Sequence, residues 1–189
     1  DVQAMAEAAR KQLQDHEAQP RPLSAGQPEQ ALIWQEGETW CRARLDWLHD
    51  DRKTIDDYKT TGGSANPEVW SRTLFDAGHD VQAAFYLRGL KVLTGIDATF
   101  RFVVQENFPP FALSVIGLAP DALALADKKV QHAIACWQHC LSTGRWPGYP
   151  TVTCWATLPP WEEARWLEGR QPVTDDGRAL ADQLFGEAV

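Results

Sequence analysis

The chain has 189 residues, of which 44% are hydrophobic and 23% are charged, so it can bury the core of one globular domain. No stretch is apolar over the length of a membrane span, and the polar first residues do not resemble a secretory signal peptide, so we expect a cytoplasmic protein. The net charge of −8 argues against a protein that coats nucleic acid with a basic surface, but not against an enzyme with a carboxylate metal site. Because residue 1 is not a natural start, we also expect further sequence upstream of it.

The first third of the chain predicts one helix and three strands. An apolar stripe indicates a helix over residues 2–16, and a loop rich in Pro, Gly and Gln follows over residues 19–30. Strands are predicted over 31–36, 39–48 and 54–60, joined by short polar turns. Together the three strands predict a β-meander.

The rest of the chain predicts alternating helices and strands. Asn66 can cap a helix that has Pro67 in its first turn. The later elements are expected at these residues: a helix over 79–94 ended by Gly95, strands over 98–107 and 111–118, a helix over 120–143 ended by Gly144, and a short helix over 159–169. Residues 175–189 predict either a helix packed on a neighbour or a frayed tail.

The order of these elements predicts the fold class. It indicates an α/β domain with a mixed central β-sheet flanked by helices. The sequence shows no internal repeat and no low-complexity segment. We therefore expect one domain over residues 1–170 and a C-terminal helical tail over residues 171–189.

The residues that point to chemistry lie in the stretch RLDWLHDDRKTIDDYKT. Residues two apart on a strand face the same side, so Asp57 and Lys59 project together while Asp56 points to the other face. A short hairpin brings Asp46 of the preceding strand beside them. Two carboxylates that converge in this way repel each other unless a cation lies between them.

A magnesium ion suits such a site, because it prefers oxygen ligands and keeps several waters. The predicted ligands are Asp46, Asp57 and the main-chain carbonyl of Tyr58. The ion would lower the pKa of a bound water, and Lys59 would orient that water, help to deprotonate it or offset phosphate charge. The alternative is a solvated surface hairpin with a Lys–Asp ion pair, which contributes under about 1 kcal/mol.

Five segments in this order resemble the RecE-type exonucleases of phages and prophages, PD-(D/E)XK enzymes related to lambda exonuclease and to the RecB nuclease domain. The resemblance covers the chain from Gln30 to about Trp166. The segments are CRARLDWL with the first aspartate, TIDDYKTT with the second carboxylate, the lysine and a threonine, HDVQAAFYLRGL with a Gln-x-x-x-Tyr motif at Gln82 and Tyr86, FVVQENFPP, and CLSTGRWPGY.

This resemblance implies a fold, an activity and partners. The fold is a PD-(D/E)XK, restriction-endonuclease-like α/β core, and the activity is an ATP-independent, Mg²⁺-dependent DNA exonuclease that Mn²⁺ also supports. Such an enzyme degrades one strand from the 5′ end of double-stranded DNA and leaves a 3′ single-stranded tail for a RecT-type annealing protein. The resemblance also implies a homo-oligomeric ring, trimer or tetramer, that encloses DNA in a bacterial host.

Further site residues are expected on the same grounds. Gln82 and Tyr86 lie one helical turn apart and would line the active site, although satisfying buried polar groups is an alternative role. Arg42 and Arg44 alternate with Asp46 on one strand, so they could meet DNA phosphates or simply balance nearby carboxylates.

Other positions match the family less closely. Thr60 belongs to the threonine-bearing segment and is a candidate DNA contact, whereas Glu29 is either a further metal ligand or a loop carboxylate. RecE-type enzymes carry a histidine on an upstream helix that contributes to the metal site, and no residue here matches it. His16 ends the first predicted helix, but its surroundings resemble the segment after that motif. Tyr58 stands where an aliphatic residue is more usual.

Four cysteines are present, without a CxxC pair: Cys41, Cys136, Cys140 and Cys154. They are interpreted as buried or free thiols in a reducing compartment. The alternative is an iron–sulfur cluster, since Cys136 and Cys140 lie one turn apart on a predicted helix.

Two other functions stay open beside the exonuclease. One is a catalytically inactive DNA-end or partner-binding module on a nuclease fold. The other is a restriction-like endonuclease, which would cut closed circular DNA, whereas an exonuclease needs a free end.

Overall fold

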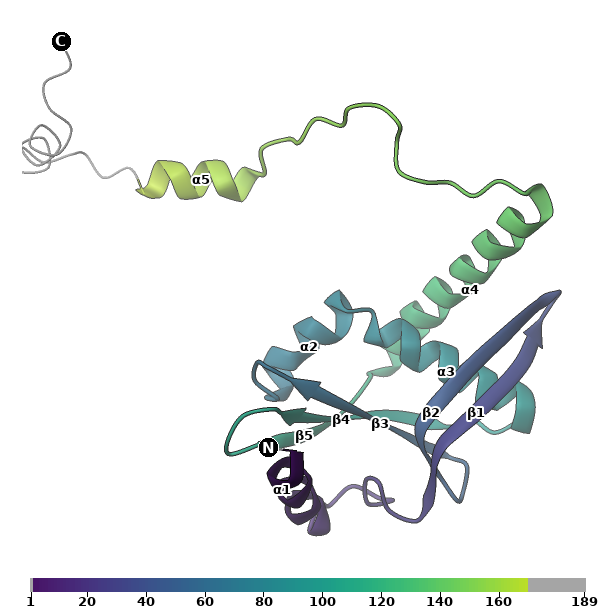
Figure 1. Ribbon diagram of the computed structural model, residues 1–189, viewed down its shortest axis with the longest axis vertical. Helices are drawn as coiled ribbons and strands as arrows, with labels where there is room; N and C mark the ends of the chain where they lie inside the picture. Colours follow the sequence, from purple (N-terminus) through teal and green to yellow (C-terminus); the bar gives the residue numbers. More distant parts are fainter. Residues whose placement is uncertain (1, 170–189) are drawn as a thin grey trace, which may run out of the picture. The chain divides into compact units, whose positions relative to one another are not determined.

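Five strands form one mixed sheet in the computed structural model, which describes residues 2–169 (Figure 1). The strands are neighbours in chain order, and β3 and β4 run parallel while the other pairs are antiparallel. Their bounds are β1 (Gly26–Glu36), β2 (Thr39–His49), β3 (Thr54–Thr61), β4 (Thr99–Glu106) and β5 (Leu113–Gly117). The predicted mixed sheet and the β-meander of the first three strands are confirmed.

Strand β1 is longer than its sequence indicates. Residues 26–30 were expected in a loop because of their Gly, Pro and Gln content, and that expectation is wrong: they pair with the second half of β2, from Gly26 opposite His49. Gly26 lies so close to β2 that a Cβ atom there would be 2.6 Å from the Leu48 carbonyl oxygen. Pairing with a long neighbour therefore overrides the local preference of these residues.

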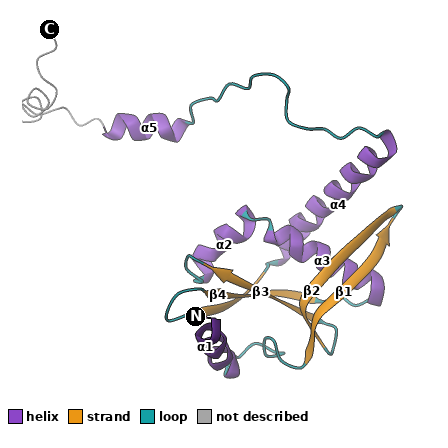
Figure 2. Cartoon of the chain, viewed as in Figure 1, coloured by secondary structure: helices purple, strands orange, loops and turns teal. Residues whose placement is uncertain are grey.

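The helices cover both faces of the sheet, with α1 on one side and α2 and α3 on the other (Figure 2). Their bounds in the first part of the chain are α1 (Val2–Gln14), α2 (Pro67–Asp76), α3 (His79–Thr94) and α4 (Pro120–Thr143). The predicted cap is confirmed, since the Asn66 side chain accepts a hydrogen bond from the Glu68 amide at 2.9 Å. Helices α2 and α3 fill the crossover that a parallel β3–β4 pair requires.

The main core lies between the sheet and α3. Trp34, Leu45, Ile55 and Phe102 are large strand residues of this core, and each is at most 2% exposed. On α3, a Cβ atom at Gly89 would lie 2.7 Å from the Trp34 ring, so this helix approaches the sheet closely only because the position carries no side chain. This packing seats α3 against β1 and β2.

Strands β2 and β3 are paired over a short length only. Their ladder consists of Leu48 opposite Ile55 and Trp47 opposite Asp56. One step further, the Tyr58 amide donates to the Asp46 carboxylate at 2.9 Å instead of to a β2 carbonyl. The strands therefore diverge at Asp46, and this fork in the sheet creates the space in which the candidate site lies.

The chain divides into two compact units, one up to Arg145 and one from Trp146 onward that contains α5 (Pro160–Gly169). This division comes before the expected boundary at residue 170, and the expected tail over 171–189 lies outside the described residues. Among residues 2–169, none of the helices combines the length and the apolar character needed to cross a bilayer.

Candidate active site

The centre of the candidate site is the carboxylate of Asp57 on β3, which is 1% exposed. Its Oδ2 atom forms an ion pair with the ammonium group of Lys59, two residues along the same strand. Its Oδ1 atom accepts a hydrogen bond of 2.7 Å from the Gln82 amide on α3. The expected proximity of Asp57, Lys59 and Gln82 is therefore present, and both carboxylate oxygens have a donor.

Asp46 lies across the fork from Asp57. Its Oδ2 atom accepts the Tyr58 amide hydrogen bond, which orients the carboxylate toward β3. In a strand, the N–H and C=O groups of one residue point to the same side, so the Tyr58 carbonyl also faces the fork. The expected trio of Asp46, Asp57 and the Tyr58 carbonyl thus borders one space between two strands.

The pKa of the Asp57 carboxylate is raised above its ordinary value. Burial raises the pKa of Asp57, the Lys59 ammonium and the Gln82 amide oppose that rise, and the nearby negative charge of Asp46 adds to it. The Lys59 ammonium also lies 5.9 Å from the centre of the Phe102 ring, which favours a cation there. A buried carboxylate with a second acidic side chain beside it is stabilised by any further positive charge in the fork.

His79 belongs to this site, although the sequence analysis did not select it. Its ring stacks on Trp70 with centroids 5.5 Å apart, and it forms a side-chain hydrogen bond with Gln82. Burial lowers the pKa of His79, and the positive charge of Lys59 lowers it further. His79 therefore lies beside Gln82, which in turn holds Asp57; the spacing of His79 three residues before Gln82 was the available signal.

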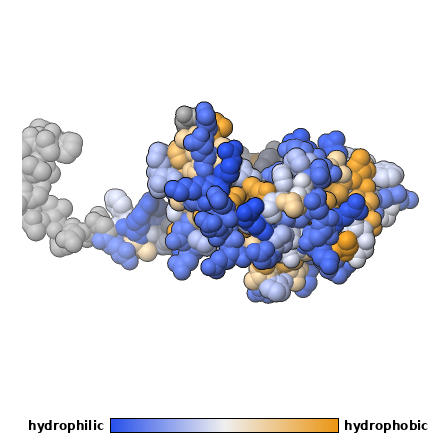
Figure 3. Space-filling model, turned by 90° about the horizontal axis from the view of Figure 1, so that it is seen from below, coloured by the Kyte–Doolittle hydropathy of each residue, from blue (hydrophilic) through white to orange (hydrophobic). Residues whose placement is uncertain are grey.

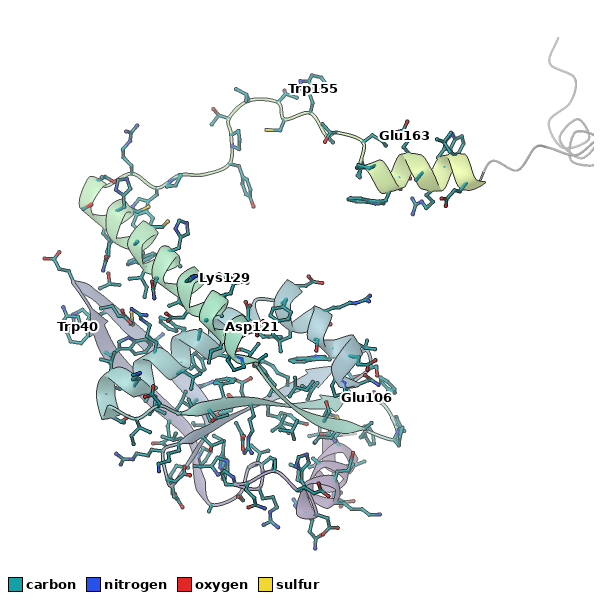
Figure 4. All side chains as sticks on the ribbon, turned by 180° about the vertical axis from the view of Figure 1, so that it is seen from behind. Trp40, Glu106, Asp121, Lys129, Trp155 and Glu163 are labelled. Atoms are coloured by element: carbon teal, nitrogen blue, oxygen red, sulfur yellow. The ribbon has the colours of Figure 1, made fainter. Side chains whose placement is uncertain are left out.

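The first turn of α3 is held from outside by helix α4. The buried carboxylate of Asp80, adjacent to His79, binds the ammonium group of Lys129 at 2.6 Å. Lys129 is labelled on α4 in Figure 4. This contact fixes the helix start that carries both His79 and Gln82.

The donor atoms at the fork are oxygens, the ligand type that hard divalent ions such as magnesium prefer. Magnesium is commonly held by one or two carboxylates, with waters and substrate phosphates completing the octahedron. Asp46, Asp57 and the Tyr58 carbonyl could supply the protein ligands of such a coordination shell. Zinc sites use three or four Cys, His or carboxylate side chains. No group of three such side chains converges anywhere in residues 2–169. When bound, a divalent ion would stabilise phosphate charge and lower the pKa of a water.

Some expected site residues lie elsewhere. Tyr86 packs edge-on against Phe100, with ring centres 6.1 Å apart, and lines a surface hollow with Arg42 and Arg44. Arg44 forms an exposed ion pair of 2.9 Å with Glu29. Glu29 lies on β1 between Pro28 and Gln30, which pair with Trp47 and Leu45 of β2, and its carboxylate is paired with Arg44.

Thr60 and His16 are also separate from the carboxylates. Thr60 is exposed and lines a groove on the α1 side of β3, with Tyr58. The His16 ring accepts a hydrogen bond from the Ala18 amide at 3.1 Å, which is a local turn contact. All four cysteines are free thiols.

Asp56, next to Asp57, points to the opposite face of the sheet, where its contacts stabilise the fold. Its carboxylate is fully buried and binds Arg101 at 2.7 Å and His49 at 2.6 Å. It also accepts the Leu23 amide, and Arg101 donates to the Pro20 carbonyl. These bonds attach the loop after α1 to the sheet, so adjacent aspartates on one strand serve the fold and the candidate site separately.

Comparison with known proteins gives one family. The family model described as PDDEXK-like domain of unknown function (DUF3799) matches residues 1–154. No curated protein sequence matches the chain.

The solved structures that match the chain include two with low sequence identity. A crystal structure from Eubacterium rectale, provisionally named an exonuclease, has 14% sequence identity and a TM-score of 0.55 over 78% of this chain. The chain spans 62% of the length of that structure, and at this identity the likeness concerns the fold alone. A crystal structure named SSO0001 has 14% identity and a TM-score of 0.36 over 65% of this chain and 60% of its own, which supports no argument. The expected PD-(D/E)XK, restriction-endonuclease-like fold is confirmed, and the RecE type stays a prediction.

Proposed function

The chain belongs to the family of PDDEXK-like domains of unknown function, and from this premise we propose that it is a metal-dependent nuclease that hydrolyses phosphodiester bonds in DNA. One observation carries the proposal. Asp46 and Asp57 border the fork between β2 and β3, and Lys59 lies directly against Asp57. A fold alone does not determine function, whereas this set of side chains has the charges that phosphodiester hydrolysis requires.

Each residue has a role that follows from its contacts. Asp46, Asp57 and the Tyr58 carbonyl would hold a divalent ion, and Mg²⁺ is the ion we propose, with Mn²⁺ as a substitute. The ion would supply charge stabilisation at the phosphate and a water of lowered pKa. Gln82 and His79 keep Asp57 in position. Lys59 can donate to a phosphate oxygen or to the attacking water, because its ammonium group is partly exposed beside the carboxylate.

Within this class, we propose an exonuclease that acts on double-stranded DNA ends without ATP. The support is the order of the motifs in the sequence, which resembles RecE-type enzymes. The same resemblance supports 5′-to-3′ degradation, a ring of three or four subunits and a RecT-type annealing partner.

Digestion of linear duplex DNA tests the proposal. The unaltered chain with Mg²⁺ should release nucleotides, and Lys59→Ala should lower the rate by at least about 100-fold, the scale of losing a preorganised charge-stabilising donor. Lys128→Ala removes an exposed lysine of α4 and serves as the matched control, with an unchanged rate expected.

Three results would count against the proposal. Equal rates for the unaltered chain and Lys59→Ala would show that the activity does not come from this site. Cleavage of closed circular DNA would replace the exonuclease with an endonuclease on the same fold, and a complete lack of digestion would favour a non-catalytic DNA-binding module.

A further inference from the structure

A second surface on β3 lies on the side of α1, away from the carboxylates. It is a groove of about 940 Å³ between α1, the loop after it and the strand residues Tyr58 and Thr60. One wall is apolar and consists of α1 and loop residues such as Met5, Leu13 and Leu23. Figure 3 views the molecule from this side and shows hydrophobic patches set among hydrophilic residues. The fold assigns no occupant to this groove.

The charges that line the groove are all positive. Arg10 and Arg21 border it, and no Asp or Glu is among the lining residues, although the chain has 26 acidic and only 18 basic residues. Among residues 2–169, neither arginine forms an ion pair with a carboxylate, and both are exposed. In a protein of net charge −8, this absence of carboxylates makes the groove a local site for anions.

The groove and the candidate active site share strand β3. Tyr58 and Thr60 alternate along β3 with Asp57 and Lys59, so the two sets project to opposite sides of the same four residues. The Tyr58 hydroxyl donates to Gln105, which holds the aromatic ring in place at the groove wall. The groove therefore lies on the face of β3 opposite to Asp57 and Lys59.

We propose that the groove binds a segment of single-stranded DNA next to the cleavage site. Single-strand-binding surfaces combine cations that meet phosphates with apolar and aromatic side chains on which bases stack, and this groove offers both within one wall. A duplex hides its base faces and would leave the apolar wall unused, and an acidic peptide has no base faces to stack on Tyr58. The proposal rests on the nuclease function and names the form of substrate that the chain holds.

Fluorescence anisotropy with a labelled oligothymidylate of about 12 nucleotides tests the proposal, since single-strand sites cover roughly 4 to 16 nucleotides. The full chain is used without divalent ions, so that no cleavage occurs. The double variant Arg10→Ala with Arg21→Ala should bind more weakly, and its slope of log K against log salt should be shallower by about 1.4, at about 0.7 for each lost phosphate contact. Tyr58→Leu should weaken binding by about 5- to 150-fold, the range of one lost base stack.

The matched control is Arg72→Ala, which removes an exposed arginine of α2 on the other face of the sheet and should change neither quantity. Unchanged affinity and salt slope in the double arginine variant would overturn the proposal. Equal displacement of the oligonucleotide by an oligoglutamate peptide of the same charge would also overturn it in favour of an acidic peptide ligand. Binding that persists in a chain without any digestion would instead count against the nuclease function, so the two failures are distinguishable.

Discussion

Replacing Gln82 with alanine tests whether the support of Asp57 matters for function. The Gln82 amide donates to Asp57 Oδ1 at 2.7 Å, and this is a hydrogen bond between a neutral donor and a buried carboxylate. Hydrogen bonds to charged groups contribute about 1.5–3 kcal/mol. Losing this bond should therefore weaken Mg²⁺ binding by about 10- to 150-fold, since about 1.4 kcal/mol corresponds to a factor of ten.

The direction of the pH effect follows from the same contact. The Gln82 hydrogen bond opposes the rise in the pKa of Asp57 that burial causes. Without it the pKa rises further, so the carboxylate needs a higher pH to ionise. The acid limb of Mg²⁺ binding should accordingly move to higher pH in Gln82→Ala.

A Mg²⁺ titration monitored by thermal denaturation measures this effect without depending on catalysis, because an ion that binds only the folded state raises its stability. Gln131→Ala is the matched control, since Gln131 donates to the carboxylate of Asp127 at 2.6 Å on the exposed surface of α4. Equal Mg²⁺ affinity and equal pH dependence in Gln82→Ala and Gln131→Ala would rule out this role of Gln82.

Two further predictions separate the fold from the site. Asp56→Ala leaves the buried guanidinium of Arg101 without its carboxylate and should lower the free energy of unfolding by about 3–5 kcal/mol in urea denaturation; a loss below about 1 kcal/mol would contradict the structural role. His79→Phe keeps an aromatic ring on Trp70 but removes the bond to Gln82, so DNA digestion should slow while the fold persists. Because the pKa of His79 is lowered in the folded state, the unfolded chain binds more protons, and stability should fall as the pH drops below about 6.5. Urea denaturation at about pH 7.5 and about pH 5.5 should show a smaller fall for His79→Phe than for the unaltered chain, and an equal fall would contradict this assignment.

The local part of the site was predictable from the sequence. Side chains two apart on a strand share a side, which brings Asp57 and Lys59 together, and a short hairpin brings Asp46 opposite them. The i, i+4 spacing on α3 placed Gln82 and Tyr86 on one helix face, yet only Gln82 contacts Asp57. Tyr86 lies one turn further along α3, where its ring contacts Phe100 of β4.

Long-range packing explains what the sequence did not predict. His79 joins the site because α2 supplies Trp70 as a stacking partner, and nothing near His79 in the sequence indicates that contact. The pairing of residues 26–30 with β2 depends likewise on a strand some 20 residues away, from Gly26 opposite His49. Asp56 was predicted only to face the other side, and its partner Arg101 comes from the far end of the crossover.

The most direct test of a metal-dependent site at the fork between β2 and β3 is a crystal structure of the chain soaked with Mn²⁺. We expect an anomalous scattering peak about 2.0–2.3 Å from oxygen atoms of both Asp46 and Asp57, with the Lys59 ammonium moved off the Asp57 carboxylate. A soaked crystal that shows Mn²⁺ at other carboxylates, while Lys59 still holds Asp57 and no ion lies between the two aspartates, would contradict it.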